Sequence, residues 1–282
     1  MKKALIIQGG GFRTAFSTGI LDAFQKNKYN PFNLYIGVSG GAIATSYFIA
    51  QQPNYCFECI KYLSANKKYL DYARVLNSQA IVDIDIFYEV SNTFMPFDFK
   101  TAESNLFGKQ LAIVMTNRKT GKPTYYHPSI NDWQDAIIAS CSFPFLTKGK
   151  HILGGVEYMD GAWSDPIPVK WAVEQGANDI TIIRTMPATA KLSKSWLDLI
   201  GEIYYRNDIG LKTAFTQNHL NYNQAVDFIQ NPPKEVVIKQ IVPEINLKAG
   251  TYSDSKELII EDYHYGFKLG EQFIAQTKSK MK

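Results

Sequence analysis

Two short apolar segments near the start of the chain each end in a glycine-rich turn that leads into a helix. Residues 5–8 precede three consecutive glycines, and residues 34–37 precede a turn that contains two more. Residues 14–26 then carry apolar side chains at helical spacing, and residues 40–50 form a helical stretch that begins with small residues. Two strand–turn–helix units in succession favour a parallel sheet, so the pattern predicts an α/β fold.

Alternation of strands and helices continues to residue 185, after which the pattern changes. Further strands are predicted at 111–115, 124–127, 151–153, 156–158 and 180–183, and helices at 133–139 and 168–175. The last third predicts helices over 193–230 and 254–279, with a strand-like segment at 235–239. We therefore expect one domain over residues 1–185 and a mainly helical region over 186–282 that packs on the same core.

Charge and hydropathy exclude several classes of protein. The chain has 30 basic and 26 acidic residues, and its lysines are scattered, which is not the footprint of a nucleic-acid-binding protein. No stretch reaches the roughly 18 apolar residues of a membrane span. The apolar run at residues 4–7 is too short for a secretory signal, which needs roughly 7–15 such residues. These features predict a cytoplasmic protein without nucleic-acid partners.

Gly37-Val38-Ser39-Gly40-Gly41 matches the pattern G-x-S-x-G at the junction of a predicted strand and helix. A sharp turn there holds the serine hydroxyl clear of the backbone. The following helix directs its N-terminal amides and the positive end of its dipole toward the serine. We predict that Ser39 is a nucleophile and that the Gly40 N–H donates to a developing oxyanion.

The loop Gly9-Gly10-Gly11-Phe12-Arg13 also joins a predicted strand to a predicted helix. Three glycines expose backbone N–H groups that can donate to an oxyanion or to a phosphate. A dinucleotide fingerprint needs a further glycine where the chain has Thr14, and the chain contains no P-loop pattern, so nucleotide binding fails on spacing. The loop is therefore interpreted as an oxyanion hole that partners Ser39.

The base that activates Ser39 has two sets of candidates. A Ser-His-Asp triad would use His219 or His264, both of which lie in stretches that favour a surface or packing role. Asp160, followed by Gly161 and Ala162, comes after a predicted hairpin strand and has a glycine beside it that gives access. Asp165, just before Pro166, is interpreted as the start of a helix.

These motifs together resemble the patatin-like phospholipases, which are acyl hydrolases with a Ser-Asp dyad. The serine and the aspartate, Ser39 and Asp160, lie 121 residues apart in the chain. Segments 30–35, 164–169 and 183–185 are similar to the bacterial branch of that family. The resemblance implies a three-layer α/β/α sheet with helices on both faces and a helical C-terminal extension. It covers residues 4–185 well and says little about the remainder.

Carried onto this chain, the resemblance implies that Ser39 is the nucleophile, Asp160 its base, and Gly9, Gly10, Gly11 and Gly40 the oxyanion hole. Arg13 would hold the loop or meet a lipid phosphate, and we favour the structural role. The implied substrate is a lipid or phospholipid ester, with peripheral membrane contact and no metal or cofactor. The alternatives are the Ser-His-Asp esterase and a catalytically idle protein that binds lipid or regulates a partner.

Cys56 and Cys59 form a single C-x-x-C pair, too little for a zinc or redox site without a second pair of ligands. We interpret them as two thiols about one helical turn apart on a core-facing segment. Phe12, Phe143, Phe145 and Trp163 lie near the motifs in the sequence. They could line an acyl cleft, but each is expected to belong to the core.

Overall fold

The computed structural model describes residues 1–77, 79–252 and 255–279. One sheet contains the strands β1 (Lys2–Ile7), β2 (Leu34–Val38), β3 (Gln110–Asn117), β4 (Pro123–Tyr126), β5 (His151–Leu153), β6 (Val156–Asp160), β7 (Ala177–Ile183) and β8 (Val237–Ile241). The helices are α1 (Thr14–Lys26), α2 (Gly40–Ile49), α3 (Tyr55–Ala65), α4 (Ile86–Glu89), α5 (Phe99–Asn105), α6 (Trp133–Ser140), α7 (Val169–Glu174), α8 (Trp196–Tyr204), α9 (Ile209–Gln230) and α10 (Lys256–Ser279). Short helical turns are η1 (Gly11–Arg13), η2 (Tyr72–Asn77), η3 (Val90–Phe94) and η4 (Gly161–Trp163).

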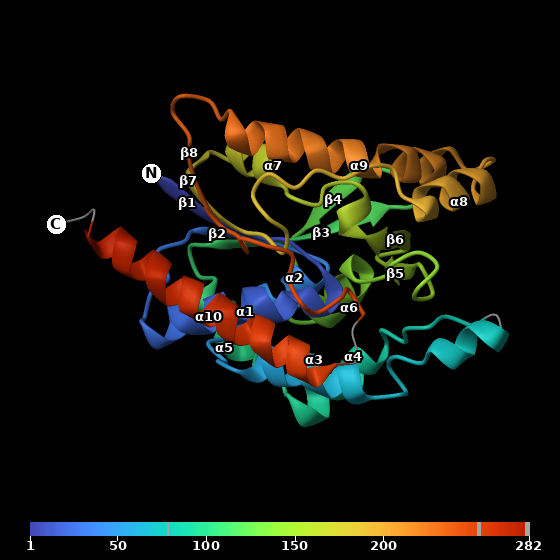
Figure 1. Cartoon of the computed structure of the whole chain (residues 1–282), viewed down its shortest axis with the longest axis horizontal. Helices are drawn as coiled ribbons and strands as arrows, with labels where there is room; N and C mark the ends of the chain where they lie inside the picture. Colours follow the sequence, from blue (N-terminus) through green and yellow to red (C-terminus); the bar gives the residue numbers. More distant parts are fainter. Residues whose placement is uncertain (78, 253–254, 280–282) are drawn as a thin grey trace.

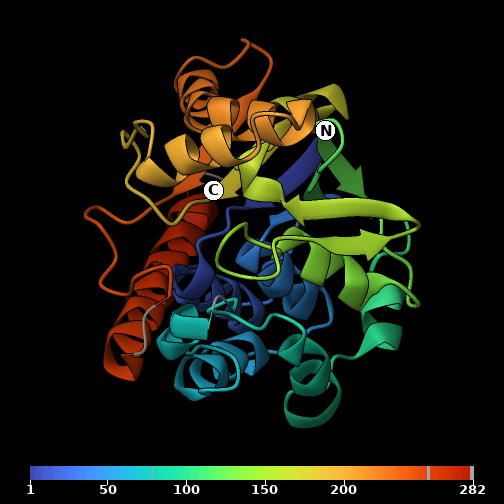
Figure 2. The same cartoon turned by 90° about the vertical axis from the view of Figure 1, so that its right-hand side faces the viewer.

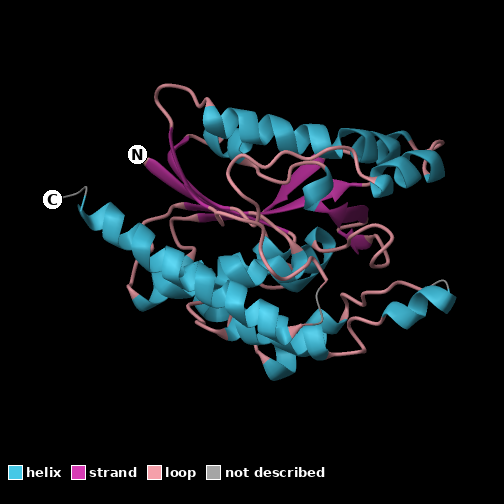
Figure 3. Ribbon diagram, in the orientation of Figure 1, coloured by secondary structure: helices cyan, strands magenta, loops and turns pink. Residues whose placement is uncertain are grey.

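The sheet is parallel at its centre and antiparallel at one side. Each strand is hydrogen-bonded to the next in the path β5-β6-β3-β2-β1-β7-β8, in which β6 and β2 follow each other along one edge of β3, and β4 pairs with the other edge. Strands β3, β2, β1, β7 and β8 run in parallel, whereas β4 and β6 are antiparallel to β3. Figure 3 shows the strands as one central layer with helices above and below it. The predicted α/β fold with a parallel sheet is therefore confirmed.

The central strands are apolar throughout because both faces of the sheet are covered. In β1, Leu5 and Ile7 pack into one core cluster, while Ala4 and Ile6 pack into a second cluster on the opposite face. All four side chains are fully buried. Strands buried on both faces read as continuous apolar runs, which explains why periodicity found them as short apolar segments.

Helices form one layer on each face of the sheet, as Figure 1 shows. Helices α1, α2, α3 and α10 lie on one face, and α7 and α9 lie on the other, with α8 beside α9. Helix α10 packs closely along α1: a Cβ atom on Gly266 would lie only 2.0 Å from the carbonyl oxygen of Phe16. The last third of the chain thus supplies a strand, β8, to the sheet and a helix to each layer.

Most predicted elements lie where the sequence indicated. The strand-like segment expected at 235–239 is β8, two residues later. Residue 254, the first of the expected C-terminal helix, and residues 280–282 of the expected C-terminal region lie outside the described residues. None of the helices in the described part of the chain is both long and apolar enough to cross a membrane.

Candidate active site

Ser39 and Asp160 meet because two strands end against each other along β3. Strand β2 pairs with the first part of β3 and ends at Val38, opposite Val114. Strand β6 runs the other way and ends at Asp160, opposite Met115, the next residue of β3. Since β4 occupies the other edge of β3 at both positions, β2 and β6 share one edge and point toward each other. Residues 121 positions apart in the chain therefore become neighbours.

The serine and the aspartate are hydrogen-bonded directly. Ser39 Oγ donates to Asp160 Oδ2 over 2.7 Å, and the Ala162 N–H donates to the other oxygen, Oδ1, over 2.9 Å. Asp160 is only 1% exposed, and this burial raises the pKa of its carboxyl from 3.8 to about 6. A carboxylate with this pKa is a better proton acceptor near neutral pH than a solvated aspartate.

The backbone turn that presents Ser39 is strained. Its φ of 54° and ψ of −130° place Ser39 in a backbone region that residues other than glycine rarely adopt. The Ser39 N–H donates to Ser140 Oγ over 2.8 Å, and that hydroxyl donates to the Val114 carbonyl over 2.6 Å. A Cβ on Gly41 would lie 2.3 Å from the Ile7 carbonyl oxygen, so only glycine fits where the start of α2 lies against the end of β1.

The glycine loop lies directly against the serine. A Cβ on Gly9 would lie 2.7 Å from the Cβ of Ser39, and Thr185 Oγ1 donates to the Gly9 carbonyl over 2.9 Å. Within the described part of the chain, no hydrogen bond uses the N–H of Gly10, Gly11 or Gly40. These donors are therefore available to a ligand beside Ser39.

Arg13 lies against the backbone of its own loop. Its Nε donates to the Gly10 carbonyl over 3.3 Å, as does its backbone N–H over 3.2 Å. Burial lowers the pKa of the guanidinium from its usual value. Arg13 thus contacts the backbone of the glycine loop, and its role in holding that loop stays a prediction.

A narrow apolar cavity of about 40 Å³ opens beside Ser39. Most of its walls come from η1, α2 and α3 and from the segments around residues 82 and 141. The lining residues are Gly11, Phe12, Thr14, Ser39, Gly40, Ile43, Cys56, Cys59, Ile60, Leu63, Tyr69, Val82, Ile84, Cys141, Thr147 and Tyr252. Its lining is mainly apolar, and its volume lies well below the roughly 300 Å³ at which ligand pockets usually begin.

One wall of the cavity comes from the C-terminal region, which the sequence did not indicate. The Thr251 carbonyl accepts the Phe12 N–H over 2.9 Å, and Tyr252 packs edge-on against the Phe12 ring with centroids 6.3 Å apart. Helix α10 anchors this segment, because the buried Asp262 carboxylate accepts the Ala249 N–H over 2.8 Å. The glycine loop is thus clamped from outside the first 185 residues.

The three cysteines also converge on this cavity. Cys56 and Cys59 are buried on α3, as expected for core-facing thiols, and they line the cavity together with Cys141. Of the four aromatic residues named from the sequence, only Phe12 is a lining residue. Phe143, Phe145 and Trp163 pack instead in a separate cluster around Phe215.

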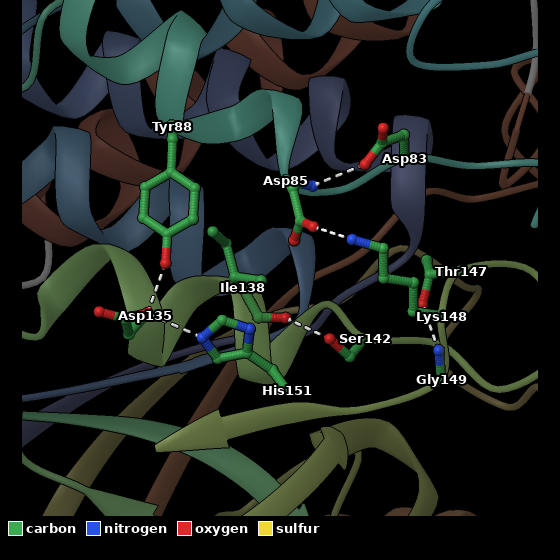
Figure 4. Close-up of polar contacts among 10 residues, drawn as sticks. All are labelled: Asp83, Asp85, Tyr88, Asp135, Ile138, Ser142, Thr147, Lys148, Gly149 and His151. Atoms are coloured by element: carbon green, nitrogen blue, oxygen red, sulfur yellow. Dashed lines mark hydrogen bonds and ion pairs between the residues drawn. The ribbon is translucent and has the colours of Figure 1, made fainter. Parts of the chain in front are cut away.

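The histidines make their contacts elsewhere. Figure 4 shows His151 paired through Nε2 with Asp135 over 2.7 Å, and Tyr88 bonded to the same carboxylate. His264 is exposed on α10, and His219 lies on α9 with its Nδ1 unpartnered. Among the described residues, no histidine hydrogen-bonds Ser39 or Asp160.

Polar contacts hold the loop that follows α6, which carries the lining residue Thr147. In Figure 4, the Ser142 hydroxyl donates a hydrogen bond to the Ile138 carbonyl, and the Gly149 N–H donates to the Thr147 hydroxyl. Lys148 forms an ion pair with Asp85. Figure 2 shows this loop between α8 and η2, both of which reach toward the viewer. This side of the molecule therefore combines the cavity wall with two projecting helical segments.

The role expected for Asp165 was wrong. It does not start a helix, because α7 begins only at Val169. Its carboxylate instead accepts the Tyr125 hydroxyl over 2.6 Å, and burial raises its pKa to about 6. In the described part of the chain, no group of three or more His, Cys, Asp or Glu side chains is arranged to hold a metal ion.

Comparison with known proteins gives the following matches. A family model described as patatin-like phospholipase matches residues 5–173, and a model described as a domain of unknown function matches residues 210–282. The uncharacterized protein YjjU of Escherichia coli K12 is 32% identical over 275 residues, which is 96% of this chain and 77% of YjjU. The crystal structure of VipD from Legionella pneumophila aligns with 98% of this chain and 67% of its own, at 12% identity and a TM-score of 0.46.

Proposed function

The chain belongs to the patatin-like phospholipase family, and we propose that it is a serine acyl hydrolase that cleaves carboxylic esters of lipids through Ser39 and Asp160. The observation that carries the proposal is the 2.7 Å hydrogen bond between the Ser39 hydroxyl and the buried Asp160 carboxylate. A nucleophile within hydrogen-bond reach of its base is the arrangement that covalent acyl transfer requires.

In the proposed reaction, Asp160 takes the proton from Ser39 Oγ as that oxygen attacks the acyl carbonyl carbon. The carbonyl oxygen becomes an oxyanion and accepts hydrogen bonds from the N–H groups of Gly10, Gly11 and Gly40. Collapse of this intermediate expels the alcohol, which leaves with the proton from Asp160, and the acyl group remains on Ser39. Water then attacks the acyl-serine, Asp160 again takes a proton, and the fatty acid and free serine are released.

The apolar cavity supports a lipid as the source of the acyl group. Its lining is mainly aliphatic, aromatic and thiol side chains, and Ser39 is one of the lining residues. The first carbons of an acyl chain in this cavity would place the ester carbonyl between the serine and the glycine loop. Remote binding of the chain would thus orient the bond to be cleaved.

We also propose peripheral contact with a lipid bilayer through α8. The helix exposes a row of aromatic and aliphatic side chains of the kind that enters membrane interfaces. Phe145, from the loop that carries the lining residue Thr147, packs on α8 and on the residue after it, so this face adjoins a cavity wall. The exposed side chains of this region are Trp196, Leu199, Ile200, Ile203, Tyr204 and Ile209. Flotation with phosphatidylcholine vesicles should recover the wild type, whereas Ile203→Ser should reduce recovery. A cytoplasmic location stays a prediction.

The two alternatives make different predictions for point variants. Under our proposal, Ser39→Ala and Asp160→Asn lose hydrolysis of p-nitrophenyl esters and of phosphatidylcholine, while His219→Ala and His264→Ala keep it. Loss of activity in either histidine variant, with folding retained, would support a triad instead. A folded wild type that hydrolyses no ester at all would support an idle lipid-binding protein.

A further inference from the structure

Thr14 carries a buried hydroxyl that has no partner within the part of the chain that the structure describes. The residue is 1% exposed, and its Oγ1 makes no hydrogen bond with any described part of the chain. A buried hydroxyl without a partner destabilises a fold, whereas an apolar side chain of the same shape would not. Threonine at this position therefore calls for an explanation other than stability.

The position of Thr14 supplies that explanation. It is the first residue of α1, immediately after the glycine loop, and it lines the same cavity as Ser39. A Cβ on Gly40 would lie 2.5 Å from Thr14 Oγ1, so the hydroxyl lies against the first residue of α2. The Gly40 N–H is one of the proposed oxyanion donors. The first residues of α1 and α2 are therefore in contact, and both line the cavity beside the serine.

We propose that Thr14 Oγ1 is an additional hydrogen-bond donor to the oxyanion, an inference that rests on the proposed acyl-hydrolase function. In the resting site the hydroxyl has no acceptor among the described residues. When Ser39 attacks the ester, the carbonyl oxygen gains negative charge and accepts from the Thr14 O–H as well as from the backbone amides. The proton stays on Thr14 throughout, so the step involves no additional proton transfer. The unpartnered hydroxyl is then a donor held ready for the transition state.

The decisive variant is Thr14→Val, which keeps the branched shape and removes only the hydroxyl. Loss of one oxyanion-hole donor typically lowers kcat by about 10²- to 10³-fold. We expect Thr14→Val to lower kcat by about 10²-fold toward p-nitrophenyl butyrate with KM unchanged, because the interaction forms only in the transition state. Its thermal unfolding midpoint should equal or exceed that of the wild type, since an unpartnered buried hydroxyl is removed. Thr14→Ser should restore most of the activity.

Ser17 offers a matched control on the same helix. Its side chain is fully buried, its Oγ also has no partner in residues 1–77, 79–252 and 255–279, and it is not a lining residue of the cavity. Ser17→Ala should likewise keep or raise the unfolding midpoint but leave kcat unchanged. Comparison of the two variants therefore separates the effect of removing an unpaired hydroxyl, expected in both, from the loss of a donor to the oxyanion, expected only in Thr14→Val.

The outcomes distinguish this inference from the proposed function. Thr14→Val that is as active as the wild type would overturn the role of Thr14 while leaving the hydrolase intact. Thr14→Val that loses activity and stability together would also overturn it, because the hydroxyl would then be structural. A wild type without any esterase activity would remove the proposed function itself, and with it this role. Loss of kcat with a retained unfolding midpoint and rescue by serine would support the inference.

Discussion

Replacing Asp160 by asparagine should stabilise the fold at neutral pH while it removes activity. Burial raises the pKa of Asp160 from 3.8 to about 6, so the folded protein favours the protonated carboxyl. The stability gained from that preference is fully present below pH 3.8 and is lost as the pH rises through about 6. A shift of one pKa unit corresponds to about 1.4 kcal/mol, so above pH 6 the buried charge lowers the free energy of unfolding of the wild type by about 3 kcal/mol. Asparagine stays neutral and avoids this penalty.

Urea unfolding of the wild type and Asp160→Asn between pH 3.5 and 8 measures the effect. The difference in unfolding free energy should be near zero at the acid end and approach about 3 kcal/mol above pH 6. Asp22 and Asp165, whose pKa values burial also raises to about 6, are present in both proteins and cancel in the difference. An asparagine variant less stable than the wild type at pH 7.5 would refute the reasoning that burial dominates at Asp160.

Other features of the site lead to further predictions. Gly9→Ala should lower kcat/KM by about 10²-fold in an ester assay. The added Cβ would lie 2.6 Å from the Val38 carbonyl oxygen, so the loop would move away from the serine. Near-normal activity would contradict this close approach. Tyr252→Ala should raise kcat/KM for long-chain esters relative to short-chain esters by about tenfold. Tyr204→Ala, outside the cavity, should leave this ratio unchanged. An unchanged ratio in Tyr252→Ala would exclude Tyr252 as a limit on the size of the acyl group. Burial raises the pKa of the thiols of Cys56, Cys59 and Cys141, so the native protein should resist thiol reagents until it unfolds. Rapid modification before unfolding would argue against this.

Local signals in the sequence were enough to locate the two strand–turn–helix units. The helix expected at residues 14–26 matches α1 residue for residue, and the G-x-S-x-G turn joins β2 to α2 as the motif requires. Glycine turns, short apolar runs and helical spacing are all encoded within a few neighbouring residues. The strand β8 was placed two residues early because its own segment has exposed and half-buried side chains and a weak pattern.

Features that depend on register between distant strands were not accessible from one sequence. Nothing local to Ser39 or Asp160 states that β2 and β6 end at adjacent positions of β3. The resemblance to a family paired them, and the strand register explains how they meet. The unpartnered hydroxyl of Thr14 and the approach of Tyr252 to the cavity likewise arise only from packing between elements far apart in the chain. The division of the chain at residue 185 stays a prediction.

The central claim is that Ser39 is an activated nucleophile, and covalent labelling tests it most directly. A fluorophosphonate probe should add to the wild type at pH 7.5, and peptide mapping should find the adduct on Ser39. Labelling should disappear in Ser39→Ala and be strongly slowed in Asp160→Asn, because the base that accepts the serine proton is gone. A folded wild type that remains unlabelled, or an adduct mapped to another residue, would contradict the account.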